Sequence, residues 1–517
     1  MIDEKQTKKN LWFYPLGTVG RDMMYYLFTN CILTYILFTK QLTHAQLLAI
    51  TGIMIAARIF DGLNDPIMGN IIERTRTKWG KFKPWLLIGV VLTSIVIYLA
   101  FNNNLQGWPF IISFGVIYFA YSITYTMNDI SYWGMVPALS SDADLRNKFT
   151  SRAILFAGIG STLATILIPI LCHGENALGG SAGKAYGIVA LVIAILAPAF
   201  LLFTLLGVRE RRDDQDPDKP KMRFGEIFSI IKNNDQLRWM ILIFLLQQIG
   251  NSLVFGGIGS TFIYFRYGYE GGLFSTFSMV GVLATAVLMV TYPMLSRKFT
   301  RKKLMTLGIL MVILGSALEL IGGLLMPAGQ DIVLGSAESP ILTLPPASFM
   351  ILTAGFMFVN LGLYSFYLIM MISIMNTVEY NELQTGQRGE AVISSMRPLL
   401  TKLGSAIVVG LTSLTYLIFR VTEMTNQISD YEQQAEIKAI TNDERMAGIK
   451  GVIAKVEPGQ TTGLLLAMVL IPLVFGFLSY ILYQKFYKLD EKKYDEICAE
   501  LEVRNALAAK NASKEGK

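Results

Sequence analysis

Two aspartates lie four residues apart inside an apolar segment early in the chain. The stretch ARIFDGLNDPIMGN, residues 57–70, places Asp61 and Asp65 on one helix face, with Asn64 between them and Pro66 directly after. A charge at the centre of a bilayer costs about 3 kcal/mol or more. Two carboxylates one turn apart also repel each other, so one takes up a proton unless a cation lies between them. The pattern therefore indicates a site that binds a cation or carries a proton.

A small hard cation such as Na⁺ or Li⁺ prefers oxygen ligands. Asp61, Asn64 and Asp65 offer such oxygens from positions i, i+3 and i+4, and Thr126, one turn before Asp129, adds a hydroxyl from a later apolar segment. If Na⁺ is the coupling ion, Asp61 and Asp65 are its charged ligands. If H⁺ is the coupling ion, one of these aspartates carries it. Both alternatives use the same residues, and no other cofactor is expected.

A second group of polar and aromatic side chains surrounds Asp129 in YTMNDISYWGMVP. Tyr125 and Trp133 flank this aspartate, and Tyr26 follows Asp22 in an earlier apolar segment. Carboxylates accept hydrogen bonds from sugar hydroxyls, and aromatic rings offer apolar faces on which pyranose rings stack. Aromatic residues near the end of a span can instead form an interfacial belt. The pattern is compatible with a sugar site and with such a belt.

Three arginines accompany these carboxylates within the apolar segments or at their ends. Arg58 precedes Asp61 by three residues, which predicts either an ion pair with a carboxylate of the same helix or a position at a cavity edge. Arg21 and Arg152 either take part in a site or extend from helix ends towards the interface.

The composition places the chain among polytopic membrane proteins. Of 517 residues, 53% are hydrophobic and 16% are charged, against about 25% charged in soluble domains, and the mean hydropathy is +0.46. The net charge of +7 does not indicate nucleic-acid binding, because the basic residues lie in short loops between spans. Three isolated cysteines and two histidines offer no metal cluster and no Ser/His/Asp arrangement, so an enzyme is not expected.

Twelve segments are long and apolar enough to cross a membrane as helices. Basic residues concentrate in the loops that follow the second and eighth spans and are missing from the loop after the third, which predicts that both termini are cytoplasmic. The predicted spans are 16–38, 45–70, 85–101, 109–135, 150–172, 186–206, 239–265, 271–296, 303–326, 348–376, 393–419 and 462–486.

The basic loops recur at equivalent places in the two halves of the chain, which is typical of a duplicated 6+6 transporter. We therefore expect an all-α integral membrane protein. Its predicted parts are a six-helix bundle over 1–206, a central cytoplasmic loop over 207–238, a second six-helix bundle over 239–486 and a cytoplasmic tail over 487–517. The segment 420–461 is placed outside the membrane as a long loop.

These motifs resemble those of the glycoside–pentoside–hexuronide:cation symporters of the major facilitator superfamily. The resemblance rests on ARIFDGLNDPIMG followed by RTRTKWGKFKPWLLIG, on YTMNDISYWGMVPAL, and on MNTVEYNELQTGQRGEAVISSMRPLLTKLGSA. It runs in order through most of the chain and implies a major-facilitator fold in a bacterial plasma membrane. It also implies symport of a sugar or glycoside with Na⁺, Li⁺ or H⁺, by alternating access.

The resemblance also implies roles for individual residues. The positions of Asp61, Asn64, Asp65 and Thr126 match those that bind the coupling cation. Asp22 and Asp129 match aspartates that bind the sugar, Trp133 a stacking tryptophan and Arg152 an arginine near the sugar. Lys402 matches a lysine close to these carboxylates that links the two bundles.

Arg397 departs from the family pattern, because members like the melibiose permease have an uncharged polar residue there. A second cation on the cavity wall would favour an anionic substrate such as a hexuronide or glucuronide, unless Arg397 only pairs with an aspartate. A carrier of lipid head-groups or other organic solutes on the same fold, and a sugar sensor that does not transport, are the alternatives. The basic loops over 73–84 and 296–303 are expected to form a cytoplasmic clamp with acidic residues such as Glu379 and Glu382.

Overall fold

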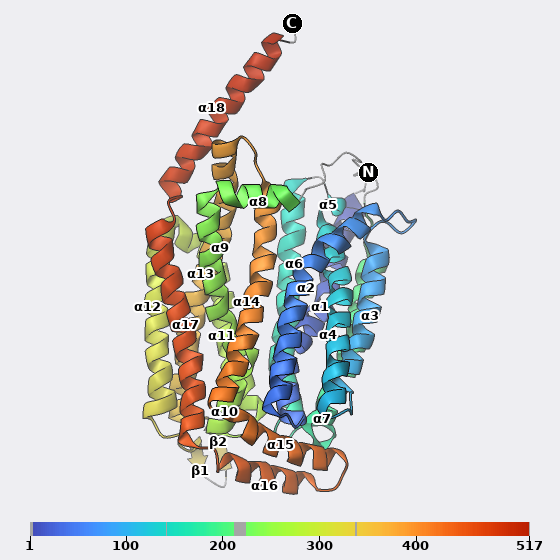
Figure 1. The fold of residues 1–517 in the computed structure, drawn as a ribbon, viewed down its shortest axis with the longest axis vertical. Helices are drawn as coiled ribbons and strands as arrows, with labels where there is room; N and C mark the ends of the chain where they lie inside the picture. The colour runs from blue at the N-terminus through green and yellow to red at the C-terminus, as the bar shows by residue number, and fades with distance from the viewer. Residues whose placement is uncertain (1–3, 141, 211–223, 337–338, 516–517) are drawn as a thin grey trace. The chain divides into compact units, whose positions relative to one another are not determined.

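A computed structural model of the chain describes residues 4–140, 142–210, 224–336 and 339–515. The described residues are almost entirely helical (Figure 1). The first half of the chain forms α1 (Glu4–Thr39), α2 (His44–Arg74), α3 (Lys83–Phe101), α4 (Gly107–Gly134), α5 (Val136–Leu139), α6 (Ala143–Cys172), η1 (Leu178–Gly180) and α7 (Ala182–Gly207).

The later part continues with α8 (Phe224–Asn233), α9 (Asp235–Ser252), η2 (Val254–Ile258), α10 (Gly259–Tyr267), α11 (Gly271–Lys298), α12 (Arg301–Leu320), η3 (Ile321–Leu325), β1 (Ile332–Ser336), β2 (Ser339–Leu344), α13 (Ala347–Thr385), α14 (Glu390–Ile418), α15 (Val421–Glu436), α16 (Asn442–Ile453), α17 (Pro458–Phe486) and α18 (Glu491–Glu515). The two strands pair antiparallel between α12 and α13.

Helix covers each of the twelve predicted spans. By length and hydropathy, ten helices in the described part of the chain are able to cross a membrane. The other two predicted spans correspond to α1, which carries Arg21 and Asp22, and to the run α9–η2–α10, which is interrupted where Gly257 adopts a φ of 116°. Only glycine adopts such a φ without strain. This agreement supports the expected all-α membrane architecture.

The helix that carries the paired aspartates is α2. It begins with a capping box, in which Thr43 accepts a hydrogen bond from the backbone N–H of Gln46 and the Gln46 side chain accepts one from the backbone N–H of Thr43. Such a box satisfies two backbone donors that a helix start leaves unpaired. The helix then continues through Pro66 to Arg74, four residues beyond the predicted end of the span.

The chain packs as two compact units. The first comprises Met1–Pro217, Val254–Met279 and Ala406–Ala467, and the second comprises Asp218–Leu253, Val280–Ser405 and Met468–Lys517. Of the predicted central loop over 207–238, residues 211–223 are not described and the later residues form α8 and the start of α9. Its place as the division between two six-helix bundles stays a prediction.

In the first unit α1 packs closely against α6 and α7. Glycines permit this approach, because a Cβ at Gly20 would overlap the backbone of Ala197 in α7 and a Cβ at Gly160 of α6 would overlap the backbone of Val19. Small residues let membrane helices approach until their backbones touch. As a consequence, the polar residues of α1 are held in fixed positions beside α4.

The second unit has its core between α9, α12, α13 and the tail helix α18. Ile497 and Leu501 of α18 are buried in this core, and Glu491 accepts hydrogen bonds from the backbone and side chain of Arg301. The predicted tail over 487–517 therefore begins with a helix that is docked on the second unit.

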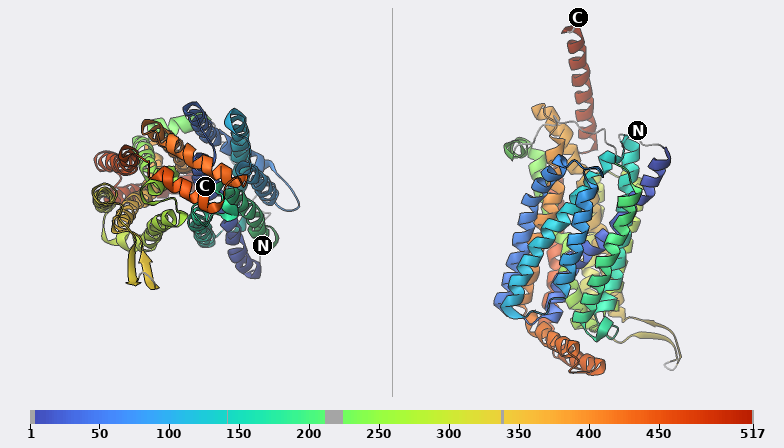
Figure 2. Two further views of the ribbon diagram at one scale, coloured as in Figure 1. Left: turned by 90° about the horizontal axis from the view of Figure 1, so that it is seen from below. Right: turned by 90° about the vertical axis from the view of Figure 1, so that its right-hand side faces the viewer.

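The predicted outer loop over 420–461 is a helical hairpin. Figure 1 shows α15 and α16 side by side, and α15 packs on α1 and α7. Figure 2 shows the same pair in orange, at the end of the first unit opposite to the N-terminus. The segment predicted as a long outer loop thus contains two helices, both of which bury side chains, and α16 begins with a capping box at Thr441 and Glu444.

Candidate functional site

The first charged group of the first unit is centred on Arg21. Its guanidinium donates to Asp22 at 2.8 Å and to Asp129 of α4 at 3.1 Å. The Arg21 side chain is 4% exposed, whereas those of Asp22 and Asp129 are 20% and 41% exposed. A buried cation thus holds two partly accessible carboxylates, and each charge offsets the desolvation of the other. The two aspartates predicted to bind sugar are brought together by a residue that joins them.

Aromatic rings cover the other side of this guanidinium. Arg21 lies over the rings of Tyr132 and Trp133, 4.7 and 5.1 Å from their centroids. Tyr125 packs against Tyr25 with the ring centroids 5.4 Å apart. These contacts place Trp133 and Tyr125 beside the carboxylates, as a sugar platform requires.

Tyr26 lies elsewhere. Its side chain is buried, 8% exposed, and faces Thr165 of α6. The structure therefore brings Tyr125 and Trp133, but not Tyr26, to the Arg21 group.

The second charged group lies between α2 and α4. Asp61 accepts a short hydrogen bond from Ser122 and forms an ion pair with Arg58, whose nitrogen is 3.8 Å from the carboxylate. Asp65 accepts a hydrogen bond from Thr126 at 3.3 Å. The ion pair predicted for Arg58 is thus present. It lowers the net charge of this group to that of one carboxylate.

Asn64 completes this second group. Its side chain is 9% exposed, and its amide nitrogen has no hydrogen-bond partner among the described residues. A buried polar side chain without a partner is costly in a finished core. The unpartnered atom is a donor and not itself a cation ligand, but the Asn64 side chain also has an amide oxygen, and its spacing places it on the helix face of Asp61 and Asp65. Carboxylate, amide and hydroxyl oxygens are the ligands of a hard cation.

Helix α4 forms a wall that the two groups share. Ser122 and Thr126 lie one turn apart and face α2, while Asp129 pairs with Arg21 of α1. A shift of α4 would therefore change the distances in both groups at once.

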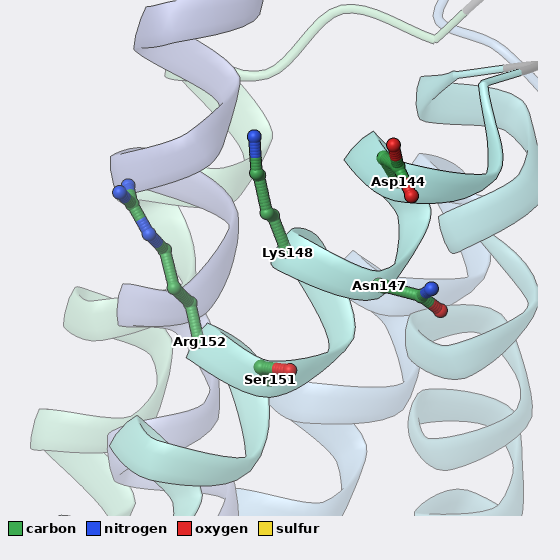
Figure 3. Close-up of a pocket in the computed structure, with 5 residues that line it drawn as sticks. All are labelled: Asp144, Asn147, Lys148, Ser151 and Arg152. Atoms are coloured by element: carbon green, nitrogen blue, oxygen red, sulfur yellow. The ribbon is translucent and has the colours of Figure 1, made fainter.

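Arg152 lies apart from both groups. It lines an open pocket on α6 of about 440 Å³ with Asp144, Asn147, Lys148 and Ser151 (Figure 3). Its guanidinium donates to the backbone oxygen of Leu11 and lies 4.8 Å from the Trp12 ring centroid. Trp12 precedes Arg21 by nine residues on the same helix, which corresponds to roughly 13 Å. The structure does not bring Arg152 to the carboxylates in this conformation.

Two further predicted site residues lie on α14 within the second unit. Arg397 is exposed and donates to the hydroxyl of Tyr367 at 2.9 Å. Lys402 is partly buried, five residues further along the helix. The partner observed for Arg397 is thus a phenol and not a carboxylate.

The loops predicted to be cytoplasmic contain their own ion pairs. Lys81 lies 3.5 Å from Glu73, whereas Glu379 and Glu382 are both held by Arg388, at 3.0 and 3.3 Å. Here the acidic residues expected to form a clamp are engaged by an arginine of the following loop.

The sequence interpretation missed two members of the site. Arg21 was predicted either to join a site or to extend towards the interface, and its central position between Asp22 and Asp129 was not foreseen. Ser122 was not singled out, although it precedes Thr126 by one turn and therefore shares its helix face. That spacing is a signal that could have identified it.

The helices and the charges between them define a class of protein, an integral membrane transporter of the major-facilitator fold. A family model described as MFS/sugar transport protein matches residues 13–491. The chain belongs to this family, so it is a multi-pass membrane transporter and not an enzyme. This confirms the family resemblance seen in the motifs around spans 2 to 4.

Curated relatives and a solved structure agree with this assignment. The chain is 26% identical to a lactose permease of Lactobacillus helveticus over 98% of this chain and 74% of that protein. It is 27% identical to a raffinose carrier protein of Pediococcus pentosaceus over 79% of this chain and 62% of that protein. A bacterial homologue of the human lysosomal transporter Spinster, solved in an inward-facing conformation, has the same fold with a TM-score of 0.63 and 12% identity, over 93% of this chain and 98% of that one.

Proposed function

We propose that this protein is a symporter that moves a sugar or glycoside together with a monovalent cation across a bacterial plasma membrane. The observation that carries the proposal is the pair of carboxylate groups on two sides of α4, one joined by Arg21 and one lined by Asn64 and Thr126. The names of the similar proteins, a lactose permease and a raffinose carrier, support a sugar as the substrate.

The Arg21 group is assigned to the sugar. Arg21 pairs with Asp22 and Asp129, which avoids leaving these carboxylates desolvated and unpaired. Sugar hydroxyls donate to the same carboxylate oxygens and accept from the guanidinium, so they can replace the ion pair without leaving a buried charge. Trp133, already against Arg21, offers its ring to the apolar face of the sugar.

The group between α2 and α4 is assigned to the coupling ion, with Asp61, Asn64, Asp65 and Thr126 as its ligands. Na⁺ or Li⁺ would bind to their oxygens, whereas H⁺ would reside on one aspartate. Because α4 belongs to both groups, binding in one affects the energy of binding in the other, and such coupling is reciprocal. The cycle is alternating access, with two six-helix bundles rocking about the central site and both termini in the cytoplasm.

Uptake by membrane vesicles with imposed gradients tests this proposal. Vesicles are prepared with an imposed Na⁺ gradient, an imposed H⁺ gradient or no ion gradient, and ionophores collapse the gradients that are not under test. Uptake of lactose, raffinose and a glucuronide is measured in each condition. We expect accumulation above the external concentration with one ion gradient only. Accumulation with no gradient, or uptake of lysolipid in place of every sugar, would contradict the proposal. The second result would instead favour a carrier of lipid head-groups.

Arg397 determines whether the sugar is neutral or anionic. Its exposed guanidinium donates to the Tyr367 hydroxyl and can pair with a carboxylate of a hexuronide. Replacement by glutamine in the same assay should then lower glucuronide uptake and leave lactose uptake unchanged. An unchanged ratio of the two rates would contradict a role for Arg397 in binding a carboxylated sugar.

A further inference from the structure

The hairpin of α15 and α16, residues 421–453, is attached to the first half of the chain by two sets of contacts. The first set joins α15 to the turn between α1 and α2. Asn426 accepts from the backbone N–H of Leu42 and donates to its carbonyl, both at 2.8 Å. Gln433 donates to the Thr39 carbonyl at 2.9 Å, and Gln41 donates to Asp430 at 3.1 Å. The side chains of α15 thus satisfy backbone groups that the helix ends leave unpaired.

The second set joins the hairpin to the turn between α6 and α7 through the two members of an ion pair that is buried within the hairpin. Arg445 of α16 lies 2.6 Å from Glu432 of α15, and the two side chains are 0% and 1% exposed. Arg445 also donates to the Gly174 carbonyl at 2.7 Å, and Glu432 accepts from the backbone N–H of Ala182 at 2.5 Å. Since Ala182 begins α7, the carboxylate also lies at the positive end of that helix.

The contribution of the Glu432–Arg445 pair to stability depends on its burial. An ion pair that water cannot reach loses stability sharply when one partner is removed, because the other charge stays buried and unpaired. A second ion pair joins α16 to the same turn, Lys450 with Glu175 at 3.3 Å, but these side chains are 63% and 61% exposed. Exposed pairs contribute little. This pair is therefore a matched control for the buried contacts between the hairpin and the α6–α7 turn.

The hairpin lies at a junction between the two halves of the sequence within the first unit. Thr51 of α2 donates to Ser413 of α14 at 2.6 Å, and both side chains are buried. Ser275 of α11 donates to the carbonyl of Ile166 in α6 at 2.7 Å. Helix α15 packs on α1 and α7, and α16 packs on α10. The hairpin thus bridges elements that alternating access would have to separate.

We propose that residues 421–453 form an outer latch, which holds the extracellular side of the transporter closed through the buried Glu432–Arg445 pair and releases it for sugar binding from outside. The latch connects α14 to α17 but is attached to the turns α1–α2 and α6–α7, so the outer junction cannot open while both attachments hold. This role rests on the proposed function as a symporter that works by alternating access.

A reversible cross-link between exposed residues tests the latch directly. Gln41→Cys and Asp430→Cys are introduced together with Cys498→Ser, and a short bifunctional methanethiosulfonate bridges the two thiols. We expect sugar influx and exchange to fall at least about tenfold on bridging and to return after reduction. The control pair, Asp430→Cys with Gln434→Cys, bridges two residues one turn apart on α15 and should leave transport unchanged. Full transport by the bridged Gln41–Asp430 protein would overturn the proposal.

A second measurement does not depend on the substrate. Ser413→Cys reports on the outer junction through its rate of alkylation by a maleimide that cannot cross the membrane. We expect Glu432→Gln to raise this rate about tenfold or more, and Asn426→Ala to raise it to a smaller extent without touching the ion pair. Lys450→Gln should have no effect. Equal rates in all of these variants would overturn the latch.

The two readouts separate failure of the latch from failure of the proposed function. If the unbridged protein accumulates no sugar but Glu432→Gln still speeds alkylation, the symporter assignment fails and the hairpin still closes the outer side. If the unbridged protein transports and bridging has no effect, the latch fails and the symporter assignment stands. Asn426→Ala serves where Glu432→Gln does not fold.

Discussion

Arg21 of α1 and Asp129 of α4 form an ion pair 3.1 Å long, although 108 residues separate them in the sequence. The guanidinium is buried while the carboxylate remains partly exposed. The exposed oxygen of Asp129 is therefore the part of the pair that a solute can reach. A solute that binds there competes with Arg21 for the carboxylate, and that competition ties substrate affinity to the strength of the pair.

Replacing Asp129 by asparagine should weaken sugar binding while the fold persists. The amide keeps the size of the carboxylate but loses the charge, and Arg21 retains Asp22 as a partner. Hydrogen bonds to charged groups contribute about 1.5–3 kcal/mol, so the half-saturating sugar concentration should rise roughly 10- to 100-fold. Initial uptake rates over a range of sugar concentrations measure this. Asp144→Asn, at an exposed position of α6, should behave as the wild type, and an unchanged affinity in Asp129→Asn would contradict the assignment.

Replacing Asp65 by asparagine should uncouple transport from the ion. Asp65 accepts from Thr126, and its charge is needed to hold a cation or a proton. We expect uphill accumulation to disappear while exchange of internal and external sugar persists. Thr126→Ala should weaken ion dependence in the same direction, and Thr126→Ser, which keeps the hydroxyl, should restore it. Accumulation by Asp65→Asn at the wild-type level would rule out this role.

Hydropathy and the cost of buried charge were sufficient to predict much of this architecture. Apolar runs of about 20 residues predict helices wherever they occur in a membrane protein, and helix covers all twelve predicted spans. Asp61 and Asp65 indicate a functional site because ionisable residues in a bilayer cost free energy and usually mark a substrate or ion pathway. These rules indicate where a residue lies along the chain and how much free energy its burial in a bilayer costs.

They do not report which side chains meet across helices. Arg21 could extend to an interface or turn inwards, and only the packing of α1 beside α4 decides between them. The hairpin of α15 and α16 was missed for another reason, because its helices are too polar to register as spans. A local signal existed, since Thr441 and Glu444 form a capping box at the start of α16. The place of Arg152 near the sugar came from the resemblance, and its neighbours here are Leu11 and Trp12.

His173 should make the protein sensitive to acid. It follows the end of α6, is 2% exposed, and lies among the rings of Phe38, Tyr186, Tyr264 and Tyr269. Neither ring nitrogen has a partner among the described residues. Burial lowers the pKa of His173 from 6.5 to about 3, and the positive charge of Arg445 acts in the same direction.

The sign of the effect follows from linkage. The folded protein holds His173 neutral, so its contribution to stability is present above pH 6.5 and is lost as the pH falls towards 3. Between pH 6.5 and pH 5 the loss is about 2 kcal/mol. The thermal unfolding temperature of the purified protein should therefore fall more steeply with decreasing pH over this range for the wild type than for His173→Phe. His44→Gln, at an exposed position, is the control and should keep the wild-type slope.

Glu210 should stabilise the loop between α2 and α3. Its carboxylate accepts from the backbone N–H groups of Lys81 at 2.9 Å and Lys83 at 3.1 Å, and so caps the start of α3, where Phe82 provides no side-chain cap. Burial raises the pKa of Glu210, and these N–H groups act against that rise. Glu210→Ala should lower the free energy of unfolding by about 1–3 kcal/mol. Glu73→Gln removes only an exposed pair with Lys81 and should cost less than about 1 kcal/mol.

Gly80 provides a double-mutant test of the same contact. Its φ is 111°, and a Cβ there would clash with the carboxylate of Glu210. Gly80→Ala therefore loses stability through backbone strain and through displacement of Glu210. In the Glu210→Ala background only the strain remains, so the double variant should lose less than the sum of the single losses. Thermal unfolding of the four proteins measures this coupling. Strictly additive losses of stability would show that Glu210 does not pack against Gly80.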